Sequence, residues 1–209
     1  MNKLYYLTFL LLSFTFNAQL KEIKDLKIIE KRFDSILVAY QKRAKDSLSH
    51  LKKKERNEIM VLEESKIYER KKNEERLQLE RIKDKELEIE NLKLPDKFGR
   101  CEMTGDFKMP NLLNKTKYKP TIIKNKQESK SGDNESLSST VIFQITSDGF
   151  VKNVSANGKN ADFNTDGKNA DFNTELELTL YKLEKLTPRC LNGFTKTERY
   201  RLPVTMNFN

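Results

Sequence analysis

The sequence predicts an α+β protein in which a long, charged N-terminal helix or coiled coil precedes a small β-β-α-β module with an antiparallel sheet. No glycine or proline occurs before residue 95, and residues 20–94 are rich in Lys, Glu, Arg, Leu and Ile, which favour or tolerate helix. In two segments after residue 139, residues 140–145 and 198–208, apolar residues alternate as they do in strands. A charged fraction of 34% beside an apolar fraction of 36% indicates that much of the chain is solvated rather than packed in one core.

Residues 1–19, MNKLYYLTFLLLSFTFNAQ, have the order of a secretory signal peptide. Basic Lys3 is followed by a mostly apolar stretch, residues 4–16, and by a small-residue end at residues 17–19. The apolar stretch is shorter than the roughly 20 residues of a membrane-spanning helix. We therefore expect export of the chain, with an uncleaved membrane anchor as the alternative. An exported chain, although its formal charge is +9, is not expected to bind nucleic acid.

The two cysteines, Cys101 and Cys190, are expected to form a disulfide, because an exported chain meets an oxidising compartment. Two separate thiols are the alternative, since spacing alone does not determine connectivity.

Residues 20–94 are expected to form an extended helix, about 110 Å long if continuous. Its first third carries an apolar seam with steps of three, four and seven, which is typical of a coiled coil and predicts possible self-association through residues 20–51. The seam consists of Ile23, Leu26, Phe33, Leu37, Tyr40, Ala44 and Leu51. The pattern fails after Lys52 and returns loosely from Leu79; His50 is expected at the surface. A structural rod and a dedicated spacer both remain open as interpretations.

Pro95 ends the helix, and residues 95–139 are expected to be an irregular connector whose last part, residues 124–139, is a polar loop.

The module is predicted over residues 140–209. Residues 140–145 form a strand with Val141, Phe143 and Ile145 on one face, and Asp148-Gly149 forms a tight turn into a return strand over residues 150–156. A helix is expected over residues 174–186, opened by a capping box of Thr174 and Glu177. Residues 198–208 form the last strand, with one apolar and one polar face.

Residues 157–165 and 166–174 are near-identical copies of one nonapeptide. As a calcium loop, the repeat places Asp162, Asn164 and Asp166 at ligand positions, but Asn173 stands where the bidentate glutamate is required. We interpret the repeat as a duplication that lengthens the loop between the second strand and the helix, because closure entropy rises only slowly with loop length. Weak calcium binding is the alternative, and no cofactor or structural metal site is predicted.

The C-terminal third resembles the TonB C-terminal domain family. The residues that carry the resemblance are the strand over 141–145, Asp148-Gly149, Val151 with Val154, the helix over 174–186, Pro188, Gly193, Leu202-Pro203 and Phe208. The resemblance implies a periplasmic α+β module that binds a short segment of an outer-membrane transporter by strand addition. In this chain Pro203 cannot donate a ladder hydrogen bond, so its strand is expected at a sheet edge.

The predicted partner-binding residues are those that precede Pro203 in the last strand: Thr197, Glu198, Arg199, Tyr200, Arg201 and Leu202. Arg199 and Arg201 are expected to attract an acidic peptide. The resulting hypothesis is a periplasmic TonB-like binding module, and a link to TonB-dependent transport stays open. A coiled-coil envelope scaffold protein is the alternative. An enzyme is not predicted, because no catalytic motif occurs and the lone histidine and both cysteines lack partners for nucleophilic chemistry.

Overall fold

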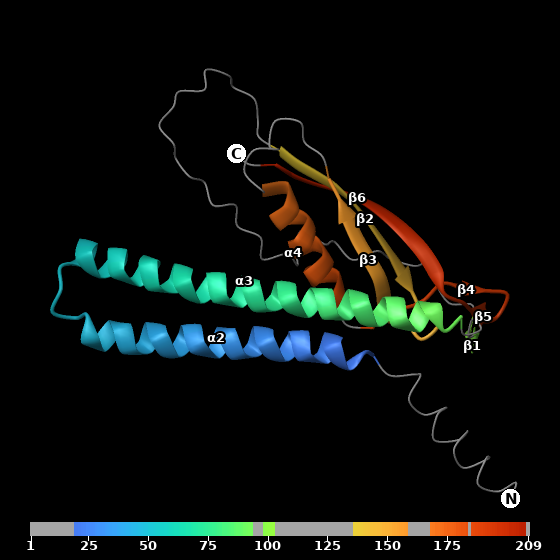
Figure 1. The fold of residues 1–209 in the computed structure, drawn as a ribbon, viewed down its shortest axis with the longest axis horizontal. Helices are drawn as coiled ribbons and strands as arrows, with labels where there is room; N and C mark the ends of the chain where they lie inside the picture. The colour runs from blue at the N-terminus through green and yellow to red at the C-terminus, as the bar shows by residue number, and fades with distance from the viewer. Residues whose placement is uncertain (1–18, 94–97, 103–135, 159–167, 184, 208–209) are drawn as a thin grey trace, which may run out of the picture. The chain divides into compact units, whose positions relative to one another are not determined.

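The structure, a computed structural model, describes residues 19–93, 98–102, 136–158, 168–183 and 185–207. Over these residues the fold is α+β: two long helices precede antiparallel sheets of three strands each, with a further helix between strands (Figure 1). The chain divides into two compact units, Met1–Leu87 and Glu88–Asn209, and each is described by itself. The predicted signal peptide and most of the predicted connector lie outside the described residues.

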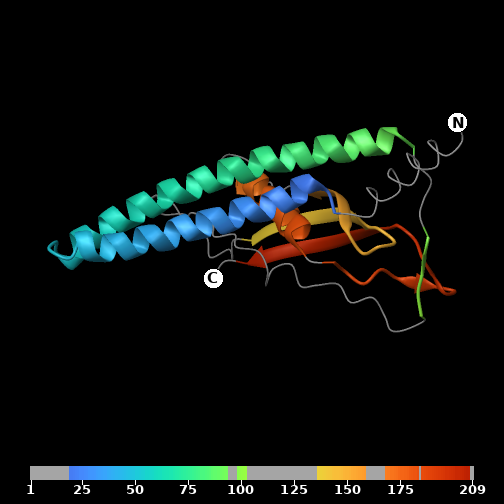
Figure 2. The same ribbon diagram turned by 90° about the horizontal axis from the view of Figure 1, so that it is seen from below.

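The N-terminal unit contains two helices where the sequence predicted one continuous rod. Helix α2 spans Lys21–Ser47 and helix α3 spans Lys53–Asn91, and the two run antiparallel side by side (Figures 1 and 2). The chain reverses at residues 48–52, where the hydroxyl of Ser49 donates to the carbonyl oxygen of Asp46 at 2.8 Å. Serine hydroxyls that bond to nearby carbonyls compete with helical hydrogen bonds, which favours a helix end here.

Four of the seven residues of the predicted seam are buried, and Leu37, Tyr40 and Leu51 are half-buried. Ile23, Leu26 and Phe33 of α2 are buried, as are Leu79 and Ile82 of α3. Self-association through residues 20–51 stays a prediction, and it would have to compete with this internal pairing. The predicted surface position of His50 is confirmed, since the residue is exposed.

Polar bonds set the antiparallel register of the two helices. Arg32 pairs with Glu74, and Gln41 donates to Glu64 at 2.8 Å. One turn from the first pair, the ammonium of Lys71 lies 3.2 Å from a carboxylate oxygen of Asp34. The prediction of one extended rod is wrong. The helices form a hairpin because folding back buries apolar side chains that a single helix would leave in water.

The C-terminal unit is built on a sheet of order β3-β2-β6, with all pairs antiparallel. Strand β2 spans Ser136–Ile145, β3 spans Val151–Asn157 and β6 spans Glu198–Asn207. Alternate residues of β2 are buried, which confirms the predicted face of Val141, Phe143 and Ile145. The strand begins at Ser136, inside the segment predicted as a polar loop, because Leu137 continues the buried alternation at 1% exposure.

The predicted Asp-Gly turn joins β2 to β3. Gly149 has a φ of 87°, and a Cβ atom at this position would lie 2.1 Å from the carbonyl oxygen of Leu186. Strand β3 then carries one extra residue relative to β2, with Asn153 at a φ of 51°. This β-bulge places Val151 and Val154, three residues apart, on the same buried face.

Helix α4, Lys168–Lys182, packs against β3 and β2 and begins six residues earlier than predicted. The predicted capping box is wrong, because Thr174 lies inside the helix. Its hydroxyl donates to the carbonyl oxygen of Ala170 at 2.8 Å. Residues 168–174 of the second copy form the first turns of α4, because Phe172 is fully buried one turn before Leu176. The interpretation of the repeat as a loop is therefore corrected for residues 168–174, while residues 159–167 lie outside the described part.

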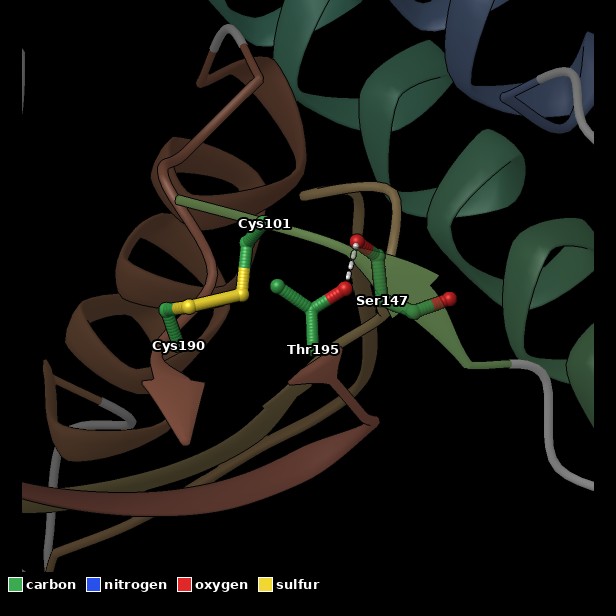
Figure 3. The surroundings of a disulfide bond; sticks show 4 residues. All are labelled: Cys101, Ser147, Cys190 and Thr195. Atoms are coloured by element: carbon green, nitrogen blue, oxygen red, sulfur yellow. Dashed lines mark hydrogen bonds between the residues drawn. A yellow bond between two sulfur atoms is a disulfide. The ribbon is translucent and has the colours of Figure 1, made fainter. Parts of the chain in front are cut away.

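A second, small sheet has the order β1-β5-β4, with β1 at Gly99–Arg100, β4 at Cys190–Leu191 and β5 at Phe194–Thr195. The predicted disulfide between Cys101 and Cys190 is confirmed (Figure 3). Asn192 and Gly193, with φ of 52° and 81°, form the tight turn between β4 and β5. This sheet was not predicted from the sequence, although Asn-Gly is the usual signal for such a turn.

Candidate functional site

Strand β6 lies at one edge of the larger sheet. It pairs with β2 in an unbroken register from Ser136↔Asn207 to Ile145↔Glu198. Within the described residues no other strand pairs with β6, so its outer side is an edge (Figures 1 and 2). The edge position that Pro203 predicts is confirmed, because Pro203 lies inside this strand opposite Thr140.

The hydrogen bonds of the opposite edge show which backbone groups of β6 point outward. The backbone N–H of Ala156 in β3 donates to a carboxylate oxygen of Glu177, so it points away from β2. Its partner in the register, Val141, must then direct its N–H and C=O toward β6, because these groups alternate along a strand. Val141 is opposite Leu202, so the backbone groups of Leu202 point inward to β2.

The same alternation makes Arg199, Arg201, Pro203 and Thr205 the residues whose backbone groups face the open edge. Pro203 has no N–H, so the edge has donors at Arg199 and Arg201 and a gap at Pro203. Proline at an outward-facing position removes no bond from the ladder to β2. This agrees with the register derived from the other edge and explains why the strand tolerates proline.

The two faces of β6 differ in chemistry. Arg199 and Arg201 are exposed on the side of the sheet away from the core, whereas Val204 on the other side is buried. On the core side the ring of Tyr200 stacks on Phe143 with centroids 5.7 Å apart.

Tyr200 also has a polar partner on the core side of β6. Its hydroxyl donates to a carboxylate oxygen of Glu198 at 3.0 Å. Partial burial, and then this hydrogen bond, raise the pKa of Tyr200 to about 12. The phenol is therefore protonated at neutral pH and remains a hydrogen-bond donor.

The edge formed by β3 is closed by side chains of α4. The hydroxyl of Tyr181 accepts from the backbone N–H of Val154 at 3.1 Å, and Glu177 accepts from that of Ala156 at 2.8 Å. Tyr181 is 1% exposed and Glu177 is 6% exposed. An incoming strand finds these two donors already occupied, which is one way in which proteins protect sheet edges.

The small sheet holds the segment that leads into β6. Thr195, at the end of β5, donates its hydroxyl proton to the carbonyl oxygen of Ser147 in the β2–β3 turn at 3.1 Å (Figure 3). The backbone N–H of Cys101 donates to the carbonyl oxygen of Gly193 at 3.0 Å, beside the disulfide. The first bond ties β5 to the larger sheet only three residues before β6 begins, and the second joins the end of β1 to the β4–β5 turn.

Five of the six predicted binding residues lie in β6, and Thr197 directly precedes the strand. The direction of the backbone N–H and C=O groups alternates along β6. These groups face the open edge at Arg199 and Arg201, and they face β2 at Glu198, Tyr200 and Leu202. Sequence reasoning missed the edge caps, Glu177 and Tyr181. The signal available was a glutamate and a tyrosine four residues apart on the predicted helix, but their partners are distant in sequence.

The described residues contain no group of three or more His, Cys, Asp or Glu side chains that could hold a metal ion. The candidate calcium ligands Asp162, Asn164 and Asp166 lie outside that part of the chain. Over the same described ranges, none of the helices has the length and apolar character needed to cross a membrane.

Comparisons of the chain with protein-family models, with curated proteins and with solved structures gave no match.

Proposed function

We propose that the C-terminal module is a periplasmic binding module that captures an extended peptide of an outer-membrane transporter, or of another envelope partner, by strand addition at β6. The observation that carries the proposal is the difference between the two sheet edges. Side chains of α4 occupy the donors of β3, whereas the outer side of β6 has no partner strand among the described residues.

Strand addition suits this edge physically. An added strand forms main-chain hydrogen bonds with Arg199 and Arg201, each contributing about 0.5–1.5 kcal/mol net. The register of β6 on β2 is continuous over the whole strand, so the edge is held in place before the peptide arrives. This preorganisation lowers the entropic cost of binding. The resemblance to the TonB C-terminal domain supports the same mode.

Amide hydrogen exchange on the exported chain, with its disulfide intact, tests the proposal residue by residue. The probes are synthetic peptides from the N-terminal segments of outer-membrane transporters. A bound strand should slow exchange of the Arg199 and Arg201 amides, which face the edge. It should leave Tyr200 and Leu202 nearly unchanged, since their amides already bond to β2. Slowed exchange at β3 instead of β6 would place the binding site elsewhere.

A pair of variants at one position provides the control. Arg201→Pro removes the outward N–H without removing a bond to β2, as Pro203 does naturally. Arg201→Val removes the same charge but retains the N–H. Strand addition predicts that the proline variant binds more weakly than the valine variant. Equal binding by both variants would contradict a main-chain contact at this residue.

A further inference from the structure

We infer that the peptide preferred at β6 alternates acidic and apolar residues, in the register that places its acidic residues opposite Arg199 and Arg201. This inference rests on the proposed function and adds the chemical class and the register of the ligand. It follows from the two faces of the edge strand and from the position of its proline.

The first step concerns the face that carries the arginines. Residues directly opposite each other in a sheet share a face, with Cβ atoms about 4.5–5.5 Å apart. The β2 partners of Arg199 and Arg201 are Gln144 and Ile142, and Gln144 in turn pairs with Lys152 of β3. This face of the sheet is therefore positive, with no acidic residue among its described positions in β2, β3 and β6. Peptide carboxylates opposite the two arginines would meet positive charge only.

The second step concerns the face toward the core. The intervening residues of the added strand would lie beside Tyr200 and Leu202, whose side chains are partly buried. Apolar side chains here extend the buried surface of the sheet. Glu198 lies on the same face, where it already accepts the Tyr200 hydroxyl at 3.0 Å. An acidic peptide residue on this side would therefore be repelled.

The third step concerns register and length. A slip of one residue exchanges the two faces of the peptide and so brings its acidic residues to the Glu198 side. Beyond Arg201 the next outward residue is Pro203, which has no donor, so the hydrogen-bonded ladder is interrupted there. The edge thus recognises a short segment, centred on Arg199 and Arg201, rather than a long strand.

Three capped heptapeptides test the pattern on the exported chain. One alternates Asp and Val, one has the same composition with the Asp and Val residues in separate blocks, and one alternates Lys and Val. We expect the alternating Asp peptide to bind about tenfold more tightly than the block peptide, since opposite-charge cross-strand pairs each contribute modestly. The preference should decrease at high salt, because the arginines are exposed.

Two substitutions separate register from general charge. Arg201→Glu should abolish the preference for the alternating Asp peptide, whereas Lys152→Glu makes the same change in net charge on the far strand and should largely preserve it. Protection of the Arg199 and Arg201 amides without any preference among the peptides would overturn the inference and leave the proposed function intact. Absence of that protection with all three peptides and with the transporter segments would overturn both.

Discussion

Replacing Tyr181 with phenylalanine removes one edge cap and leaves the aromatic ring in place. The substitution retains the ring of a side chain that is 1% exposed, so packing is preserved. What is lost is the oxygen that accepts from the backbone N–H of Val154 at 3.1 Å. Val154 is itself 3% exposed, so water does not readily replace the lost acceptor. An unsatisfied buried donor costs about 1–3 kcal/mol, and we expect the free energy of unfolding of the module to decrease by that amount.

Urea unfolding followed through the amide signals of β2 measures this change for the module alone. With a denaturant slope of about 2 kcal/mol per M, the midpoint should decrease by about 0.5–1.5 M. Native-state exchange adds a local measurement: the Val154 amide should exchange faster, while the Ala156 amide, which Glu177 caps, should follow the global change only. Tyr200→Phe is the matched control, since it removes a partly exposed hydroxyl and should cost less. A decrease below 0.5 kcal/mol with unchanged Val154 exchange would refute the idea that α4 caps this edge.

Three further predictions concern the disulfide, the repeat and the pH dependence of stability. Serine at both Cys101 and Cys190 should lower the free energy of unfolding by about 4–5 kcal/mol, because the bond closes a long loop with a sequence separation of 89; thermal unfolding at an unchanged temperature would contradict this. Phe172→Ala should lower the free energy of unfolding by about 3–5 kcal/mol, because the side chain is fully buried; an unchanged midpoint in chemical denaturation would contradict this. Since the pKa of Tyr200 is raised to about 12 from an ordinary value near 10, the protonated phenol should stabilise the fold fully below pH 10 and lose this effect as the pH rises from 10 to 12. Ultraviolet titration of the phenolate, with Tyr200→Phe as the control, measures the pKa of Tyr200. A pKa at its ordinary value would contradict the partial burial of this hydroxyl.

Much of the larger sheet could be predicted because its signals are local. Alternation over residues 141–145 identifies the buried face of β2, and Asp148-Gly149 identifies the turn. The limits of prediction were set by residues whose environment is not local. Strand β2 begins four residues earlier than predicted, in a polar segment, because Leu137 is buried. Helix α4 includes residues 168–174 of the repeat because Phe172 is buried.

The N-terminal helices show the same limit on a larger scale. The seam over residues 20–51 correctly indicated a helix with one apolar side, but a seam does not specify its partner. Folding back at residues 48–52 covers it with α3 of the same chain, and no glycine or proline marks the reversal. The contribution of Ser49 to ending α2 is visible only once its hydroxyl bond is known.

The sequence by itself determined the faces of the strands, the one pairing available to Cys101 and Cys190, and the edge position of Pro203. These depend on a period of two, on the only two cysteines in the chain, and on the missing donor of one residue. Only the tertiary structure decided that side chains of α4 close the β3 edge. It also decided that the backbone N–H and C=O groups of Arg199 and Arg201 face the outer edge of β6. The first depends on contacts between groups far apart in sequence, such as Tyr181 with Val154. The second depends on the register of β3 on β2 and of β2 on β6.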